Sequence, residues 1–138
     1  MRIRLALTAV ALAALAALPA AAAGLTSFQT PSKNIGCIGG TFDGRQFLRC
    51  DIGRTRVPAP PRPSTCDADY GNAFEMSPSG RAHRICHGDT ALGGPRVLGY
   101  GRSIRIGAFS CTSRQTGLTC RNRAGHGWFL SAGRITLT

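Results

Sequence analysis

Acidic side chains are scarce in this chain, which has 6 Asp and Glu residues against 17 Lys and Arg residues among 138. A glycosidase needs a pair of carboxyl groups that flank the bond to be cleaved. Only Asp67 and Asp69 lie close together in the sequence, and Asp67 is better placed to cap a short helix. The shortage of acids therefore argues against a glycosidase.

The chain also lacks the motifs of metal and cofactor sites. It contains no Cys-x-x-Cys pair, which is the spacing typical of many zinc sites. His83 and His87 have a spacing that on a helix places two metal ligands on one face. Their neighbours favour a strand, in which positions four apart lie about 13 Å from each other. We therefore expect surface or partly buried histidines here, and neither a metal nor a cofactor in the protein.

Long stretches of helical periodicity are missing too. Short apolar or β-branched runs alternate with turn residues, and the chain has 18 Gly and 8 Pro. This pattern is typical of all-β domains. The sequence predicts a small disulfide-stapled domain of short antiparallel hairpins with at most one short helix, within residues 67–76. Besides the two hairpins described below, strands are expected at 82–87, 97–100 and 134–138.

The first residues have the order of a secretory signal peptide. Two arginines precede an uncharged run rich in Ala and Leu, and small residues follow Pro19 as far as Gly24. A membrane anchor is the alternative, because the uncharged run 5–23 nearly reaches the ~20 residues of a spanning helix. Pro19 and the weakly apolar alanines favour cleavage instead. We expect removal of residues 1–23, leaving 24–138 as one exported, periplasmic or extracellular domain without a stable membrane anchor.

All six cysteines lie in the part that remains. An even number of cysteines in a short exported chain predicts three disulfides rather than a nucleophile or metal ligands. The pair Asp43-Gly44 predicts a two-residue hairpin turn, because both positions of a type I′ turn need positive φ. Counting outward from this turn, Cys37 faces Cys50 as a non-hydrogen-bonded pair, within reach of a disulfide. A bulge at Gly39 and Gly40 is the feature that would shift this register.

A second hairpin is predicted from strands 108–113 and 118–122, which flank a four-residue loop, 114–117, that ends in Gly. This arrangement places Cys111 opposite Cys120. Cys66 and Cys86 are then paired by elimination, without geometric support of their own.

Residues 53–65 form a Pro-rich connection between the halves of the domain. Such a segment is extended and polyproline-like. It is either a ligand for aromatic grooves or a stiff surface linker, and we favour the linker.

Positive charge dominates the surface chemistry that the sequence predicts. The formal net charge is +11, and loss of Arg2 and Arg4 lowers it by two to +9. Lys33 is the only lysine, and the basic residues form no run of five or six. We expect weak, salt-dependent binding to polyanions such as an anionic envelope polymer, or a protein partner, without sequence-specific recognition of nucleic acid.

Two sets of residues are candidate sites. Arg121, Arg123 and His126 lie near the only tryptophan, Trp128, where cations and an indole ring would hold an anionic or sugar-bearing ligand. The alternative is that Trp128 and Phe129 straddle a strand, one of them in the core. A hydrolytic site would need a histidine, a second base and a cation, and the residues that could supply them are His87, Asp89, Arg121 and His126.

Four stretches of the chain, 30–37, 49–52, 66–74 and 117–131, resemble a bacterial family of small exported six-cysteine proteins classed as a domain of unknown function. The resemblance implies export and a compact domain, and it implies no activity. We therefore interpret the sequence as an exported non-catalytic binding or inhibitor-type domain, with no catalytic residue assigned. The alternative is a small secreted hydrolase or toxin that acts on a polyanionic substrate.

Overall fold

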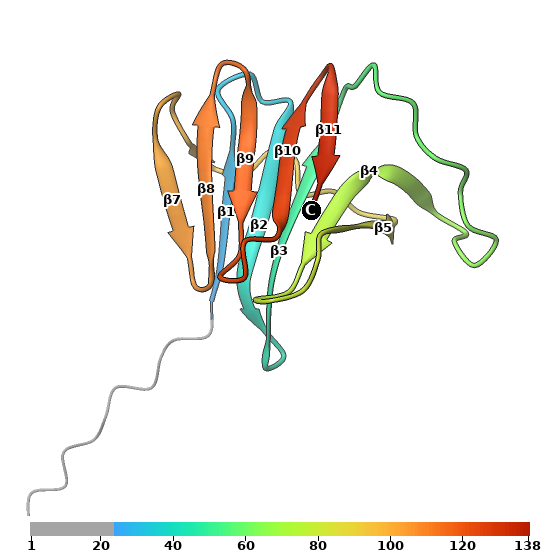
Figure 1. Ribbon diagram of the computed structural model, residues 1–138, viewed down its shortest axis with the longest axis horizontal. Helices are drawn as coiled ribbons and strands as arrows, with labels where there is room; N and C mark the ends of the chain where they lie inside the picture. The colour runs from blue at the N-terminus through green and yellow to red at the C-terminus, as the bar shows by residue number, and fades with distance from the viewer. Residues whose placement is uncertain (1–23) are drawn as a thin grey trace, which may run out of the picture.

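The computed structural model describes residues 24–138, which fold into two β-sheets packed face to face (Figure 1). One sheet has the strand order β5-β4-β3-β2-β1-β6 and the other has the order β11-β10-β9-β8-β7. Neighbouring strands are antiparallel except for β1 and β6, which run parallel. The strands are β1 (Leu25–Gln29), β2 (Ile35–Phe42), β3 (Arg45–Ile52), β4 (Asp69–Met76), β5 (His83–His87), β6 (Arg96–Val97), β7 (Ser103–Ile106), β8 (Phe109–Arg114), β9 (Gly117–Arg121), β10 (Gly127–Ser131) and β11 (Arg134–Leu137).

The all-β prediction is confirmed. The predicted signal peptide lies outside the described residues. Within the part of the chain that the structure describes, no helix is long and apolar enough to cross a membrane.

The two predicted hairpins have the predicted registers. Asp43 and Gly44 have φ values of 49° and 73°, and the pairing from Phe42↔Arg45 to Ile35↔Ile52 is continuous. The glycines of β2 therefore do not shift the register, because the strand stays paired through both of them. In the second hairpin Arg114 pairs with Gly117, so the loop has two residues, Gln115 and Thr116, rather than the predicted four.

The sequence allowed at most one short helix, within residues 67–76, and this segment contains strand β4 instead. Its Phe74 and Met76 are fully buried, and the strand pairs with β3 on one side and β5 on the other. Gly71 has a φ of 115°, which an α-helix does not allow. The structure also differs from the sequence-based expectation in three of the strands. The strand expected at 97–100 is only the two-residue β6, and β1 and β7 were not predicted.

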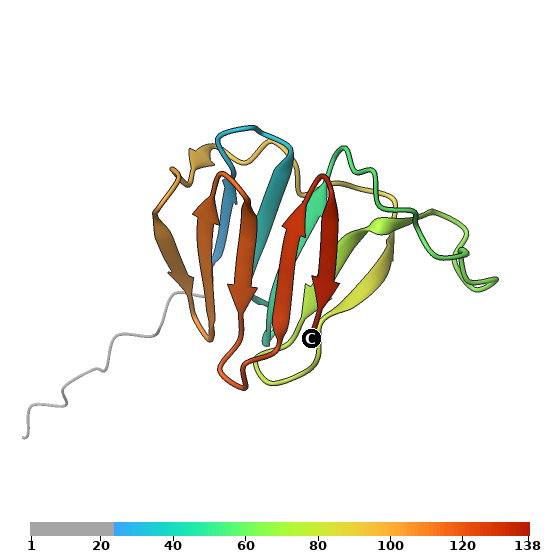
Figure 2. The same cartoon turned by 45° about the horizontal axis from the view of Figure 1, so that its top comes forward.

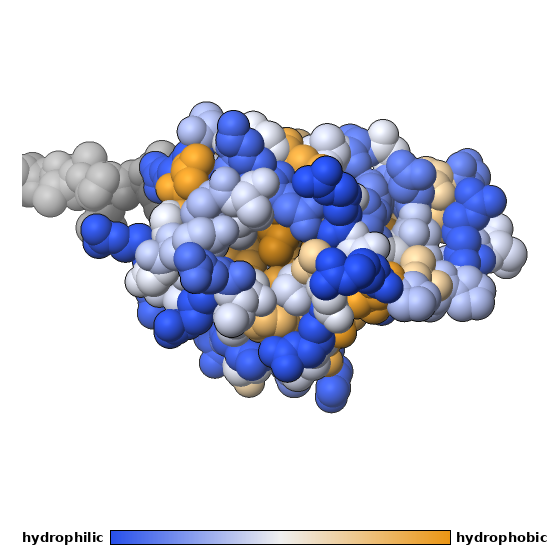
Figure 3. Space-filling view, turned by 90° about the horizontal axis from the view of Figure 1, so that it is seen from above, coloured by the Kyte–Doolittle hydropathy of each residue, from blue (hydrophilic) through white to orange (hydrophobic). Residues whose placement is uncertain are grey.

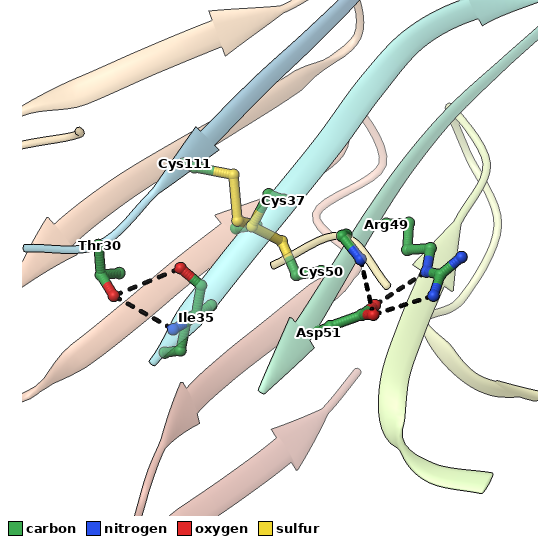
Figure 4. Close-up of a disulfide and its surroundings, with 9 residues drawn as sticks. Thr30, Ile35, Cys37, Arg49, Cys50, Asp51 and Cys111 are labelled. Atoms are coloured by element: carbon green, nitrogen blue, oxygen red, sulfur yellow. Dashed lines mark hydrogen bonds and ion pairs between the residues drawn. A yellow bond between two sulfur atoms is a disulfide. The ribbon is translucent and has the colours of Figure 1, made fainter. Parts of the chain in front are cut away.

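The core lies between the sheets, and two disulfides form its centre (Figure 4). Cys37–Cys50 joins β2 to β3, and Cys111–Cys120 joins β8 to β9, each with 4.1 Å between its Cα atoms. The sulfurs of Cys37, Cys50 and Cys120 lie within 4.8 Å of one another, but all are bonded in disulfides and none is a thiolate ligand. Cys66–Cys86, predicted only by elimination, is also present.

A connection that we call the strap, residues 88–95, runs from β5 to β6, which are the opposite edges of the larger sheet. It crosses the outer face of that sheet, where Gly36 allows close contact. A Cβ atom at this position would lie 2.6 Å from the Cα atom of Leu92 and would clash with the carbonyl oxygen of Ala91. Only glycine therefore lets the strap lie against β2.

Candidate functional site

Several turns lie at one end of the sandwich (Figure 2). They line an open hollow of about 470 Å³, which we call the bowl. Seen from above, this end shows hydrophilic side chains around an apolar floor (Figure 3). The bowl is formed by the β1–β2 turn, the segment after β3, Tyr100, the β8–β9 turn and the β10–β11 turn. Its lining residues are Thr30, Ser32, Asn34, Ile35, Arg54, Thr55, Arg56, Tyr100, Arg114, Gln115, Thr116, Gly117, Ser131 and Ala132.

The segment 54–56 connects the two sheets across one wall of the bowl. The backbone N–H of Arg54 donates to Asn34 Oδ1 at 2.8 Å, and Asn34 Nδ2 donates to the carbonyl oxygen of Arg54 at 2.9 Å. The N–H of Arg56 donates to the carbonyl oxygen of Ala132 at 2.7 Å. All three residues of this segment, Arg54, Thr55 and Arg56, belong to the lining of the bowl.

The bowl carries positive charge without a compensating acid. Arg54, Arg56 and Arg114 are exposed, and within residues 24–138 their guanidinium groups form no hydrogen bond or ion pair. No carboxylate or imidazole belongs to the described residues that line the hollow. Because guanidinium groups only donate hydrogen bonds, this wall favours anionic ligands that accept them.

The other polar groups of the bowl divide into two sets. The first set forms hydrogen bonds within and between the turns and consists of Thr30, Ser32, Asn34, Thr55 and Ser131. The side chains of Tyr100, Gln115 and Thr116 form no hydrogen bond to the rest of the described chain, and Tyr100 is 44% exposed. These three groups are therefore available to a ligand.

A second polar cluster lies beneath the strap and is structural. Asp51, 1% exposed, accepts hydrogen bonds from Nε and Nη2 of Arg49 at 2.8 and 2.9 Å (Figure 4). It also accepts the N–H of Ala91 at 2.9 Å. Arg49 Nη1 donates to Asp89 Oδ1 at 2.7 Å. The arginine is thus fully engaged in joining β3 to the strap.

Because Arg49 contacts Asp89, we expect the free energy of unfolding to depend weakly on pH in the acidic range. The hydrogen bond from Arg49 holds the pKa of Asp89 below its ordinary value. An ionised carboxylate whose pKa is lower in the folded than in the unfolded protein stabilises the fold at every pH above the unfolded-state pKa of about 3.9. This stabilisation is lost as the pH falls through the lower pKa of the folded state. Because the Asp89 side chain is 79% exposed, water screens the pair.

We expect Asp89→Asn to lower the free energy of unfolding at pH 7 by less than about 1 kcal/mol. At about pH 2, below the unfolded-state value, the difference between the two proteins should be smaller, because protonation of Asp89 removes the charge that Asn lacks. Urea titrations at the two pH values measure the difference. A deficit of the same size at both would contradict an ionic contribution.

The family model of DUF6636, a family of unknown function, matches residues 8–138. The chain belongs to this family. The resemblance seen in the sequence is therefore confirmed, and six cysteines in three disulfides agree with it. Comparison with curated proteins and with solved structures finds no match. For this DUF6636 protein, the function has to be argued from the geometry of the chain itself.

The structure does not bring the four residues of the first predicted site together. Trp128 is fully buried, and its ring lies 6.5 Å from that of Phe74, centroid to centroid. Arg121 and Arg123 are exposed and His126 is half-buried. Trp128 is thus inside the sandwich, while the adjacent Phe129 lies on the other face of β10, as the alternative interpretation expected, with the guanidinium of Arg134 at 4.2 Å from its ring centroid.

The residues of the predicted hydrolytic site lie in two places. His87 ends β5 of the larger sheet and Asp89 follows it in the strap, whereas Arg121 ends β9 of the smaller sheet and His126 precedes β10. His87 is buried, with Nδ1 at 2.7 Å from the carbonyl oxygen of Asp89 and Nε2 at 2.9 Å from Asn72 Oδ1. Arg121 donates to the Thr138 hydroxyl at 3.0 Å. No hydrogen bond or ion pair among residues 24–138 joins either His87 or Asp89 to Arg121 or His126.

The remaining candidate residues from the sequence lie on or next to strands β4 and β5. His83 and His87 lie at the two ends of strand β5, as the strand interpretation expected. Asp67 and Asp69 are both exposed.

Proposed function

We propose that this protein is an exported, non-catalytic binding domain that holds an anionic ligand in the bowl. The observation that carries the proposal is that three arginines, Arg54, Arg56 and Arg114, line one hollow. Within residues 24–138 their guanidinium groups form no hydrogen bond or ion pair. The signal-peptide order of the first residues and the three disulfides support export.

The chemistry of the lining favours binding over hydrolysis. A hydrolase needs a group that takes up or releases a proton near neutral pH, most often His, Asp or Glu. The described residues of the bowl include none of these. Arginine stays protonated in proteins and supplies charge without transferring protons.

Specific binding in the bowl should differ from the general attraction of a positively charged protein in its dependence on salt. Scattered exposed arginines attract polyanions over a distance that salt shortens to about 8 Å at physiological ionic strength. Guanidinium groups that donate directly to a bound anion contribute more, about 1.5–3 kcal/mol for a hydrogen bond to a charged group. Binding through the bowl should therefore persist at a salt concentration that removes the background attraction.

The test replaces the three bowl arginines together, as Arg54→Gln, Arg56→Gln and Arg114→Gln. Titration calorimetry with a sulfated heparin oligosaccharide at about 150 mM salt should show binding weakened at least about tenfold, since each lost charged hydrogen bond approaches a factor of ten. The oligosaccharide should remain intact, because the bowl does not catalyse its hydrolysis.

A matched control removes the same charge elsewhere. Arg45, Arg81 and Arg105 are exposed and do not line the bowl. Their triple replacement by Gln should change the affinity by less than about threefold, as expected for screened charges. Equal losses in the two triple variants would show that only net charge matters and would overturn the proposed site.

A further inference from the structure

The proposed function does not specify the chemical class of the anion. The residues that line the bowl favour one class over the others. Resting on that function, we infer that the bowl accepts an acidic sugar, a pyranose ring that carries a carboxylate or sulfate group. The inference comes from Tyr100 and from the two uncharged groups, Gln115 and Thr116, that lie with the arginines in the lining.

Tyr100 provides an exposed aromatic ring in the lining of the bowl. The N–H of Gly101 donates to the carbonyl oxygen of Ser113 at 2.7 Å, and the N–H of Ser113 donates to that of Arg102 at 2.9 Å. These bonds hold the Tyr100 segment alongside the end of β8, where Arg114 lies. An exposed aromatic ring buries an apolar face of a ligand while its hydroxyl stays wet. A pyranose has such a face, and a chain of phosphates does not.

The free polar groups match a ligand that both donates and accepts hydrogen bonds. The guanidinium groups of Arg54, Arg56 and Arg114 only donate. Gln115 and Thr116 both donate and accept, and their side chains are free of hydrogen bonds within the described chain. A polyphosphate would leave these acceptors without partners, whereas the hydroxyl groups of a sugar satisfy them. A carboxylate or sulfate on the same ring then pairs with the arginines.

The shape of the bowl favours a sugar unit over a nucleic acid strand. Its volume of about 470 Å³ falls within the range of small-molecule sites. The lining includes the buried Ile35. Tyr100 is the single aromatic residue among the described lining residues. Proteins that bind single-stranded nucleic acids stack successive bases on several aromatic rings along a groove.

The experiment compares three probes of defined chemistry: an oligogalacturonate, a neutral maltooligosaccharide and a polyphosphate with the charge of the first. The protein should bind the oligogalacturonate most tightly and the neutral sugar weakly. Tyr100→Ala should weaken binding of the oligogalacturonate about fivefold or more, because the ring contact is lost. It should leave polyphosphate binding unchanged. Tyr100→Phe keeps the ring and should retain most of the affinity.

The outcomes separate this inference from the proposed function. If polyphosphate binds as tightly as oligogalacturonate and Tyr100→Ala weakens neither, the bowl still binds anions but the sugar inference is overturned. Tighter, Tyr100-dependent binding of a single-stranded oligonucleotide would overturn it as well. If the triple arginine variant binds every anion as the wild type does, both the inference and the proposed function fail.

Discussion

Asp51→Asn should lower the free energy of unfolding by about 3–5 kcal/mol, the usual cost of breaking a buried ion pair. The carboxylate is 1% exposed and accepts three hydrogen bonds, two from Arg49 and one from the N–H of Ala91. An amide cannot accept at both of its polar atoms, so Arg49 loses its buried charged partner and keeps only the Asp89 carboxylate, whose side chain is 79% exposed. Urea denaturation at pH 7 measures the loss.

Asp67→Asn is the control for this variant. It makes the same change of charge at an exposed position. Surface substitutions of this kind change stability by about 0.5 kcal/mol or less. If the two variants unfolded at the same urea concentration, the pair beneath the strap would not stabilise the fold. Retained anion binding by folded Asp51→Asn would agree with a structural role separate from the bowl.

Removal of the Cys37–Cys50 disulfide by replacing both cysteines with Ala should destabilise the protein by about 4–5 kcal/mol. About 3 kcal/mol of this comes from the larger conformational freedom of the unfolded chain. The rest comes from the cavity left by two sulfurs, since both cysteines are fully buried against the second disulfide.

The Cys66–Cys86 disulfide provides the comparison. It closes a longer segment, with a sequence separation of 20 against 13, which raises the entropic contribution by only about 0.4 kcal/mol. Cys86 is exposed, and Cys66 is buried but lies outside the core cluster, so removal of this pair leaves a smaller cavity in the core. The double Ala variant of this pair should therefore lose less stability. A larger loss than that of the Cys37–Cys50 variant would show that loop length, rather than core packing, governs these disulfides.

The bowl shows why the proposed binding surface could not be predicted from the sequence. Arg54 and Arg56 lie in the segment that reads as a Pro-rich linker, and Arg114 lies beside a hairpin turn about sixty positions later. The one available signal was that each borders a turn or a connection, where binding residues often occur. With 16 arginines in the chain, that signal did not distinguish these three.

Local patterns by themselves determined the two cystine hairpins. The Asp43-Gly44 turn and the period-two geometry of strands place Cys37 opposite Cys50, because both effects act within a few residues. Cys111 and Cys120 face each other for the same reason, even though the loop between them is shorter than predicted. The alternation of short apolar runs with turn residues along the chain likewise determined the all-β class.

Only the tertiary structure decided how these hairpins are combined. Strand β4 is extended because it pairs with β3 and β5 and buries Phe74 against Trp128, contacts that outweigh a local tendency towards a helix. The same packing of two sheets places Trp128 in the core, away from the arginines near it in sequence. Contacts between the sheets join segments far apart in the chain, so no local pattern encodes them, and the bowl exists only where those sheets meet.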